Sequence, residues 1–416
     1  MRPLPDVAPG LDGASVESLL SDLQQVMDGA YQPSHPGALA HLDPPPLTAS
    51  IAAELVCAGL NNNLLAEELS PGLTGLEHDL CRWFCHRIGL PAGSGGVLAS
   101  GGTLSNLMAL VAARAALKAS HRDPVLLCSQ DAHVSINKAA KVMGLADDAL
   151  QTLPVAADGG LCLEALAKRL RSLQAEGRPC LAVVATAGTT VRGAIDPLSD
   201  LATLCRDAGV WLHVDAAIGG VFALTARHAS LMDGMESADS ITLNPQKLLG
   251  ITKASSLLLL RDRTHLRQAF STGLPYMEAP KGMDHGGEIG LQGTRPAEIL
   301  KLWLGLRQLG EAGIEATLSG ALQRRNAFAA QLDPKKFTLL AGDLHLLAFH
   351  PRHRDVTAAC RWSEDTRQML LSHGYMLSRP FYGDRFCLKA VFGNPHTTAQ
   401  HLSDLSGRLN QSLAPA

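Results

Sequence analysis

Short apolar runs alternate with amphipathic segments through the middle of this chain, and this alternation constrains the fold more than any other feature. The apolar runs have the length of buried strands, and the segments between them carry apolar residues at helical spacing. Such alternation is typical of a mainly parallel sheet with helices on both faces. The expected strands span 124–129, 181–185, 211–215, 241–243 and 255–260, and the expected helices span 107–117, 134–143, 161–176, 197–208 and 297–309.

The chain divides into three parts by its pattern. Residues 1–75 combine one amphipathic helix, expected at 16–27, with proline-rich connectors, which indicates an arm that packs on something else. Residues 76–310 form the large α/β domain, and residues 311–416 a smaller α+β domain. A chain of 416 residues can bury a large core. At the helix expected from Pro197, we expect Asp196 to cap the first turn.

Composition narrows the classes of function. A net charge of −3 gives no reason to expect nucleic-acid or anionic-membrane binding. The chain has no run of about 18 or more apolar residues and no signal-peptide pattern at its start, so we expect a cytoplasmic protein. Nine cysteines without paired spacing are typical of reduced core residues. Cys81, Cys85 and His86 could share a helix face, but no second ligand pair follows, and we expect no metal.

Two charged side chains follow neighbouring strands of the expected sheet. Asp215 ends the strand 211–215, and Lys247 comes shortly after the strand 241–243. Ligands of such sheets bind beyond the carboxyl ends of the strands, so both side chains are expected in one pocket. A lysine amine can form a Schiff base with the aldehyde of pyridoxal phosphate (PLP), and a carboxylate can pair with its pyridinium nitrogen. The pair therefore predicts a PLP site.

Three further polar segments favour the same site. The glycine segment and Thr186 also fit ordinary turns, and His133 also fits a polar residue whose hydrogen bonds are satisfied within the protein. The glycines of Ser100–Thr103, before an expected helix, would let backbone N–H groups approach a phosphate. His133 follows an expected strand, where an imidazole could stack on the cofactor ring and exchange protons near neutral pH. Thr186 ends the strand 181–185 and could place its hydroxyl near the phenolic oxygen of the cofactor or the substrate carboxylate.

Taken in order, these segments resemble the fold-type I, group II PLP-dependent amino-acid decarboxylases, from about His35 to about Thr397. That family includes enzymes for aromatic amino acids, glutamate, cysteine sulfinate, aspartate and 2,4-diaminobutyrate. The resemblance implies PLP as cofactor, a seven-stranded sheet, and a homodimer whose site lies at the interface and whose N-terminal arm clasps the partner. It is carried by residues 70–77, 100–107, 131–133, 186–190, 213–217, 244–247 and 292–295.

The resemblance also implies a role for each matched residue. Lys247 would be the Schiff-base lysine and Asp215 would hold the ring nitrogen. Ala217 and His133 would pack on the two faces of the ring. Tyr276, on a loop, would protonate the substrate carbon after CO2 leaves, with His133 as a second candidate. The remaining cofactor residues would be Gly102, Thr103 and Asn244 around the phosphate, Thr186 near the ring, Gln246 beside the lysine, and Thr294 reaching the phosphate from the second subunit.

Two positions depart from the family pattern. Gln246 stands where relatives usually carry a histidine; it can hydrogen-bond the phosphate or hold the lysine, but it cannot titrate. Lys389 stands where relatives usually carry an arginine that grips a substrate carboxylate. A lysine offers a point charge without the bidentate fork, so altered carboxylate recognition is a hypothesis beside that of an ordinary surface lysine.

The sequence thus predicts decarboxylation of an L-amino acid to its amine. Residues 41–46, with 61–63 and 70–71, are most similar to bacterial 2,4-diaminobutyrate decarboxylases. Acidic substrates rank second, and aromatic ones third because aromatic residues make up only 4% of the chain. One alternative is a PLP lyase or desulfurase that uses Cys360 or Cys387, although neither lies in a glycine- or serine-rich loop. Another is a PLP-binding homologue without catalysis.

Overall fold

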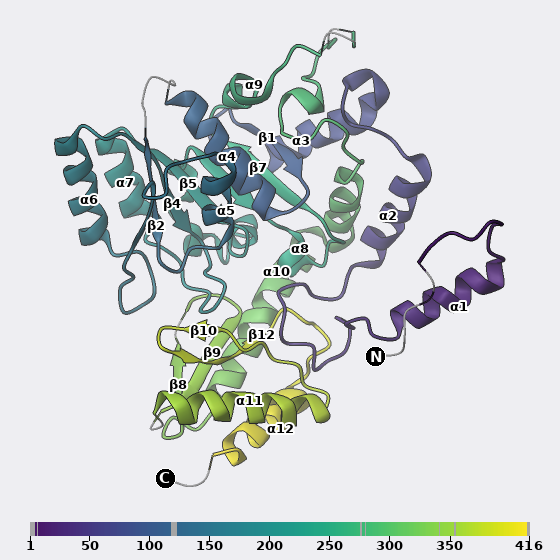
Figure 1. Cartoon of the computed structure of the whole chain (residues 1–416), viewed down its shortest axis with the longest axis vertical. Helices are drawn as coiled ribbons and strands as arrows, with labels where there is room; N and C mark the ends of the chain where they lie inside the picture. The colour runs from purple at the N-terminus through teal and green to yellow at the C-terminus, as the bar shows by residue number, and fades with distance from the viewer. Residues whose placement is uncertain are drawn as a thin grey trace.

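A seven-stranded sheet forms the centre of the molecule (Figure 1). The computed structural model describes residues 5, 7–117, 123–274, 277–278, 280–340, 342–352 and 355–413. The strands are β1 (Gly95–Ala99), β2 (Val125–Ser129), β3 (Leu150–Leu153), β4 (Cys180–Thr186), β5 (Trp211–Ala216), β6 (Ser240–Leu243) and β7 (Ser256–Leu260). Their order is β1–β7–β6–β5–β4–β2–β3. Neighbours from β6 to β3 pair in parallel, whereas β7 is antiparallel to both β1 and β6. The expected mainly parallel, seven-stranded sheet is confirmed.

Helices cover both faces of this sheet. They are α3 (Pro71–Ile88), α4 (Gly102–Ala116), α5 (Ser135–Val142), α6 (Leu163–Glu176), α7 (Leu198–Ala208), α8 (Gln246–Leu249), α9 (Thr264–Phe270) and α10 (Ile299–Gln331). Alternate residues of β4 show the two faces. Val183 and Ala185 pack with α3, α6 and α7, whereas Ala182 and Val184 pack with α4 and α5. Because a strand turns successive side chains to opposite faces, both sets are apolar and β4 is a continuous buried run.

A second core lies at the lower end of the molecule as drawn in Figure 1. α10 runs from the large sheet into this core, and its backbone leaves helical geometry at Gly310 (φ 60°). In its centre, the aromatic side chains of Phe349 and Phe392 both lie against that of Phe328. Its other elements are β8 (Phe337–Leu340), β9 (Leu346–Pro351), α11 (Val356–Ser372), β10 (Phe381–Tyr382), β11 (Arg385–Phe386), β12 (Leu388–Val391) and α12 (Ala399–Gln411). The division of the chain at residues 75 and 310 stays a prediction.

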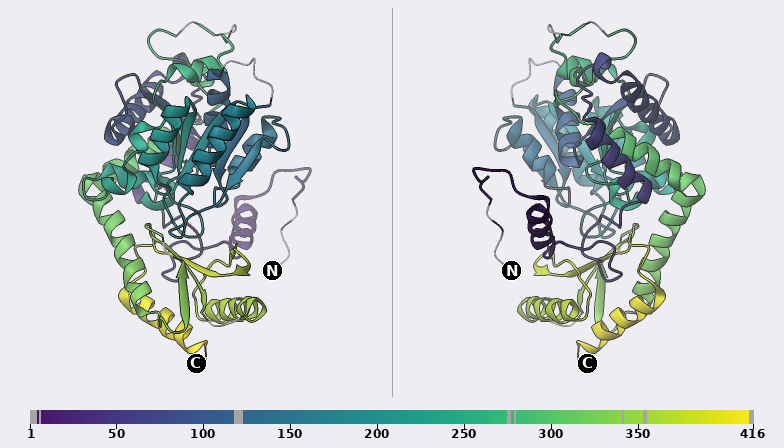
Figure 2. Two further views of the ribbon diagram at one scale, coloured as in Figure 1. Left: turned by 90° about the vertical axis from the view of Figure 1, so that its left-hand side faces the viewer. Right: turned by 90° about the vertical axis from the view of Figure 1, so that its right-hand side faces the viewer.

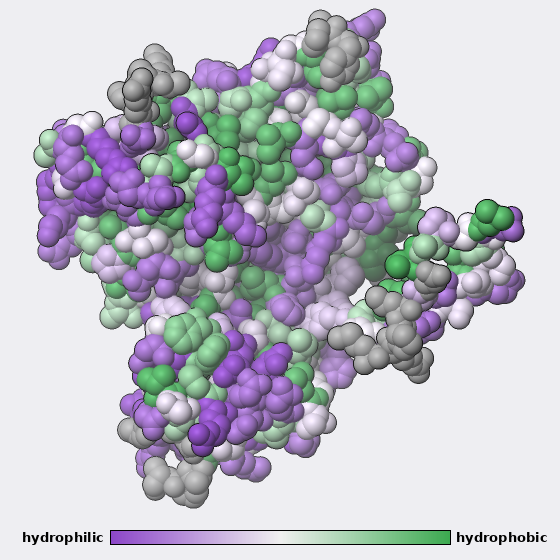
Figure 3. Space-filling view, viewed as in Figure 1, coloured by the Kyte–Doolittle hydropathy of each residue, from purple (hydrophilic) through white to green (hydrophobic). Residues whose placement is uncertain are grey.

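The N-terminal segment consists of α1 (Val16–Met27) and α2 (Thr48–Leu60) with their connectors. α1 has the predicted bounds, buries none of its residues, and stands apart from the main body (Figure 2). Its apolar side chains, such as Leu19 and Leu23, are more than half exposed. Figure 3 shows apolar surface, in green, among the polar residues of this N-terminal segment. α2, by contrast, packs along α10. In the described part of the chain, no helix is long and apolar enough to cross a membrane.

The expected cap of α7 is not formed. α7 begins at Leu198, after Pro197, and Asp196 makes no capping hydrogen bond. Instead the buried carboxylate of Asp196 accepts hydrogen bonds from the backbone N–H groups of Leu161 and Thr186, both at 2.7 Å. Burial raises its pKa to about 6. The Asp196 carboxylate binds these two backbone N–H groups rather than the start of α7, because both groups would otherwise be buried without hydrogen-bond partners.

Candidate active site

A cavity of about 150 Å³ opens where β4, β5 and β6 end. It brings together most of the side chains that the sequence placed around a cofactor, although they come from five separate segments. Parallel strands end at one edge of a sheet, and this explains why residues so far apart in the chain meet there. Its lining residues are Gly102, Thr103, Asn106, His133, Thr186, Gly188, Thr190, Asp215, Ala217, Ile218, Asn244 and Lys247.

The amino end of α4 forms one wall of the cavity. Gly101, just before the helix, has φ 106°, a conformation that favours glycine. A Cβ on Gly102 would lie within 3.1–3.2 Å of the two terminal atoms of the Asn244 amide, so the helix start fits closely against the end of β6. With its amide oxygen turned toward α4, Asn244 accepts from Gly102 N at 3.2 Å, and its nitrogen donates to Ser256 Oγ at 2.6 Å. The positive end of a 15-residue helix is thereby held at the cavity, where it suits a phosphate.

Lys247 and Asp215 both line this cavity. Burial lowers the pKa of the Lys247 amine, and the carboxylates of Asp215 and Asp43 oppose that shift. A lowered pKa increases the fraction of free amine, which is the nucleophilic form. The Asp215 carboxylate accepts hydrogen bonds from Asn106 Nδ2 at 2.8 Å and Ala217 N at 3.2 Å. These bonds fix its direction in a site where it is only 5% exposed.

The hydroxyl of Thr186 provides a test of fit for the expected cofactor. Thr186 pairs with Asp215 across β4 and β5 and lines the cavity. Its Oγ1 is buried and has no hydrogen-bond partner among the described residues. An unpaired buried hydroxyl is costly, so this one is suited to a polar group of a ligand. With a lysine amine, a carboxylate and a helix start around the same space, the residues fit PLP.

His133 reaches the cavity from the segment between β2 and α5. Its Nδ1 lies 2.9 Å from Ser135 Oγ and accepts from Ser135 N at 3.3 Å. Burial lowers the pKa of His133, Asp215 opposes the shift, and the positive charges of Lys247 and Lys138 add to it. The imidazole is therefore mainly neutral at pH 7, since its ordinary pKa is 6.5.

Lys389, on β12, reaches the same edge from the second core. Its Nζ donates to the carbonyl oxygen of Thr190, which lines the cavity, at 3.0 Å. Burial, followed by the nearby charge of Lys247, lowers the pKa of Lys389 to about 8. Both effects place Lys389 beside the cavity rather than on an open surface.

Two predicted residues of the described chain, Gln246 and Thr294, lie outside the cavity. Gln246 does not line the cavity; its Oε1 accepts from Ser255 N at 2.5 Å, so it holds the start of the strand after the lysine. Thr294 is exposed on this subunit and does not line the cavity either. Tyr276 lies outside the described residues.

The sequence pattern assigns no role to Asn106, although this residue lies within the matched segment 100–107. Asn106 is 1% exposed and lines the cavity beside Asp215. The signal was available, because Asn106 is four residues after Gly102 and three after Thr103, and such residues share one face of a helix. The helix expected from the sequence begins at residue 107, so Asn106 falls outside it, whereas α4 begins at Gly102.

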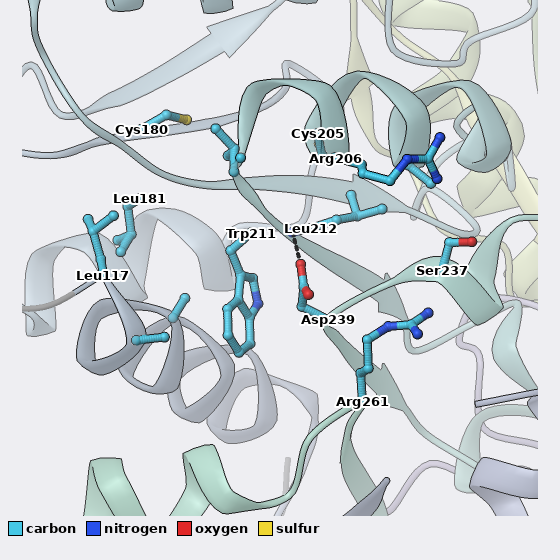
Figure 4. A pocket seen from close by; sticks show the side chains of 15 residues that line it. Leu117, Cys180, Leu181, Cys205, Arg206, Trp211, Leu212, Ser237, Asp239 and Arg261 are labelled. Atoms are coloured by element: carbon cyan, nitrogen blue, oxygen red, sulfur yellow. Dashed lines mark hydrogen bonds between the residues drawn. The ribbon is translucent and has the colours of Figure 1, made fainter. Parts of the chain in front are cut away.

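A larger cavity, of about 620 Å³, lies at the opposite ends of β4 and β5 (Figure 4). Trp211, Arg206, Arg261 and Asp239 line it. The Asp239 carboxylate accepts from Leu212 N at 2.8 Å, and burial raises its pKa. No lysine is among the described residues that line this cavity, and no helix rich in glycine begins there. The candidate site is therefore the smaller cavity.

The cysteine alternative and the metal alternative find no support in this geometry. Neither Cys360 nor Cys387 lines the smaller cavity, and burial raises the pKa of the Cys387 thiol to about 11, which disfavours the thiolate. Cys81 and Cys85 are buried in α3, and burial raises the pKa of both thiols. Over the residues that the structure describes, no group of three or more side chains could hold a metal ion.

Comparison with known proteins gives consistent relatives. The profile of the pyridoxal-dependent decarboxylase conserved domain matches residues 1–349. L-2,4-diaminobutyrate decarboxylase of Rhizobium meliloti (strain 1021) is 36% identical, over 82% of this chain and 69% of that protein. The Acinetobacter baumannii protein of the same name is 32% identical, over 73% of this chain and 64% of that protein. This chain thus spans about two thirds of these two relatives. The crystal structure of mouse CSAD in apo form has a TM-score of 0.90 at 26% identity, covering 98% of this chain and 90% of that one.

Proposed function

Because this chain belongs to the pyridoxal-dependent decarboxylase family and is a PLP-dependent amino-acid carboxy-lyase, we propose that its substrate is L-2,4-diaminobutyrate. The observation that carries the substrate is the position of Asp43. Residues 43–47 lie against the loop that follows Lys247, where Leu47 N donates to Gly250 O at 2.7 Å. Asp43 itself is paired with Lys253 at 2.9 Å and opposes the shift of the Lys247 pKa. Asp43 does not line the cavity, but its negative charge acts on Lys247 and so favours a substrate whose side chain carries an ammonium group.

The relatives support the same choice. The two diaminobutyrate decarboxylases match this chain at 36% and 32% identity, whereas the human cysteine sulfinic acid decarboxylase matches at 29%. Lys389 favours a second candidate, an acidic amino acid, because its ammonium could pair with a distal carboxylate. The negative charge of Asp43 therefore favours a substrate with an ammonium side chain, and the positive charge of Lys389 favours one with a carboxylate side chain.

The chain's own residues would share the work as follows. PLP, when bound, supplies an electron sink for the electron pair left by departing CO2. Lys247 would hold the cofactor at its aldehyde, and Asp215 would hold it at its ring nitrogen. Thr186 would offer its hydroxyl to a polar group of the cofactor, and the start of α4 would hold the phosphate. Ala217 and Ile218 line the cavity with apolar atoms, which excludes water.

Proton return to the substrate carbon would fall to His133 or to Tyr276. His133 is neutral near pH 7 and lines the cavity, so it can carry one proton there. Lys389 would pair with a substrate carboxylate, and its pKa of about 8 leaves it mostly protonated at pH 7.

The enzyme is also proposed to act in the cytoplasm as a homodimer. α1 exposes Leu19, Leu20 and Leu23 along one side, as expected of a helix that covers a partner. Thr294 is exposed, as it must be to reach the phosphate of a second subunit.

The test is an amino-acid panel with detection of both CO2 and amine, on wild type, Lys247→Ala and Asp43→Asn. We expect 1,3-diaminopropane from L-2,4-diaminobutyrate with wild type, none with Lys247→Ala, and a raised KM for this substrate with Asp43→Asn. Turnover of aspartate, glutamate or cysteine sulfinate in preference would support the acidic candidate. PLP binding without turnover of any amino acid would establish the non-catalytic alternative.

A further inference from the structure

Asn106 stands at a branch point of buried hydrogen bonds beneath the cavity. Its Nδ2 donates to Asp215 Oδ2 and to Ser135 Oγ, both at 2.8 Å. Its Oδ1 lies 3.0 Å from His213 Nε2. Asn106, Ser135 and His213 are each at most 1% exposed. The amide cannot be turned over, because its oxygen would then face the carboxylate of Asp215, and two acceptors repel each other.

This orientation determines where the protons on both histidines lie. Since Asn106 Oδ1 only accepts, His213 Nε2 must donate to it, which leaves His213 Nδ1 to accept from Ser240 Oγ at 2.9 Å. Burial lowers the pKa of His213 to about 4, consistent with one proton on the ring. Trp211 Nε1 donates to Ser240 Oγ at 2.9 Å and completes a chain of donors that all point toward Asp215.

The second branch leads to His133. Ser135 Oγ accepts from Asn106, so its own proton is free to go to His133 Nδ1 at 2.9 Å. Ser135 N donates to the same nitrogen. His133 Nδ1 is therefore an acceptor, and the proton of the neutral ring lies on Nε2, on the edge turned away from Ser135.

We propose that Asn106 is a positioning residue that fixes, from one buried amide, both the direction of the Asp215 carboxylate and the tautomer of His133. The cofactor ring would then meet a carboxylate of fixed direction at its nitrogen and an uncharged imidazole with an N–H donor at its face. The inference rests on the cofactor site and not on the substrate proposed above.

The experiment compares Asn106→Leu with a matched control, Asn394→Leu. Asn394 is also buried, at 3% exposure, and donates to Pro33 O and His35 O away from the cavity. Two quantities are measured: the Kd of PLP for the apoprotein, and the tautomer of His133 from long-range ¹H–¹⁵N histidine spectra, assigned with His133→Gln. For Asn106→Leu we expect the Kd of PLP to rise about tenfold, because that factor corresponds to the loss of one or two net hydrogen bonds. We also expect an altered tautomer of His133. Asn394→Leu is expected to change neither quantity.

Separate variants isolate the two branches. Ser135→Ala removes the hydroxyl donor and leaves His133 Nδ1 only the longer bond from the backbone N–H at residue 135, at 3.3 Å. It should therefore lower the share of the tautomer with the proton on Nε2 and leave the Kd of PLP within about threefold, and Ser135→Thr should restore the wild-type spectrum. If Asn106→Leu does not fold, His213→Leu is used instead, because it removes the N–H group that donates to Asn106 Oδ1. His213→Gln restores a donor to that oxygen. A purely structural role would be shown if Asn106→Leu or His213→Leu lowered stability but left both quantities at wild-type values. Failure of the substrate proposal would appear only in the amino-acid panel.

Discussion

The two ends of the central sheet differ in what their buried polar groups are bonded to. At the amino end, the larger cavity has an aspartate, Asp239, whose carboxylate is bonded to the backbone of Leu212. At the carboxyl end, the smaller cavity has Asp215, which is held by Asn106 and Ala217, and Thr186, whose hydroxyl has no protein partner in the described structure. Cavity size therefore does not identify the site; a polar group left available for a ligand does.

The largest difference between the two ends is expected in kcat/KM when a cationic side chain is removed from each, Lys247 at the carboxyl end and Arg261 at the amino end. Lys247→Ala should lower kcat/KM on the order of 10³-fold or more, because the lysine reacts with the cofactor. Arg261→Ala, at the amino end, should leave kcat/KM nearly unchanged, since its guanidinium is bonded to the Ala238 carbonyl. Steady-state kinetics on both variants make the test, and similar losses would mean that the amino end takes part in catalysis.

The two aspartates provide a matched pair with a smaller effect. Asp215→Ala should lower kcat on the order of 10²-fold by removing the partner of the ring nitrogen. Asp239→Ala should leave kcat intact but lower the free energy of unfolding by about 1–3 kcal/mol, because Leu212 N loses its acceptor. Activity assays and chemical denaturation of both variants distinguish these outcomes, and a reversed pattern would contradict the assignment of the ends.

Lys389, at the carboxyl end, should make the KM for the substrate depend on pH, with a change on the order of tenfold. Its pKa is lowered to about 8, so the charge that binds a substrate carboxylate is present below that pH and lost above it. KM should therefore rise as pH passes through 8, by at most about tenfold per pH unit. In Lys389→Arg the charge persists and the profile of KM should be flat there. Equal profiles for wild type and variant would remove Lys389 from substrate binding.

The smallest effect is expected from Gln246, which lies at the carboxyl end but outside the cavity. Gln246→Ala should change kcat/KM by less than about threefold, because its side chain is bonded to Ser255 N. A loss as large as that of Asp215→Ala would mean that Gln246 turns to the cofactor when PLP is bound.

Much of the fold could be predicted because the sheet is buried on both faces. The strands at 181–185 and 211–215 were found within one residue at each end, since continuous apolar runs mark them. β1 and β3 were missed, because β1 begins with two glycines and β3 is a partly exposed edge strand with two polar residues. α10 was expected to stop at 309, yet it continues past the non-helical Gly310 to Gln331.

The candidate site was predictable where a residue follows a strand end, and less so where tertiary bonds decide. Asp215 and Lys247 could be placed from the strands before them. The partner of Asp196 could not, because a helix cap is a local bond, whereas the bonds that form reach Leu161 and Thr186. The network around Asn106 joins side chains from four segments, and sequence spacing shows only the part within α4.

The bond of Asp196 to Leu161 has a consequence for how this chain can vary. One carboxylate joins the backbone just before α6 to the strand end that carries Thr186. An insertion or deletion between β3 and α6 would pull on that carboxylate and thereby displace a wall of the active site. A surface connection that would otherwise tolerate changes of length is thus restricted in length by the reaction it lies beside.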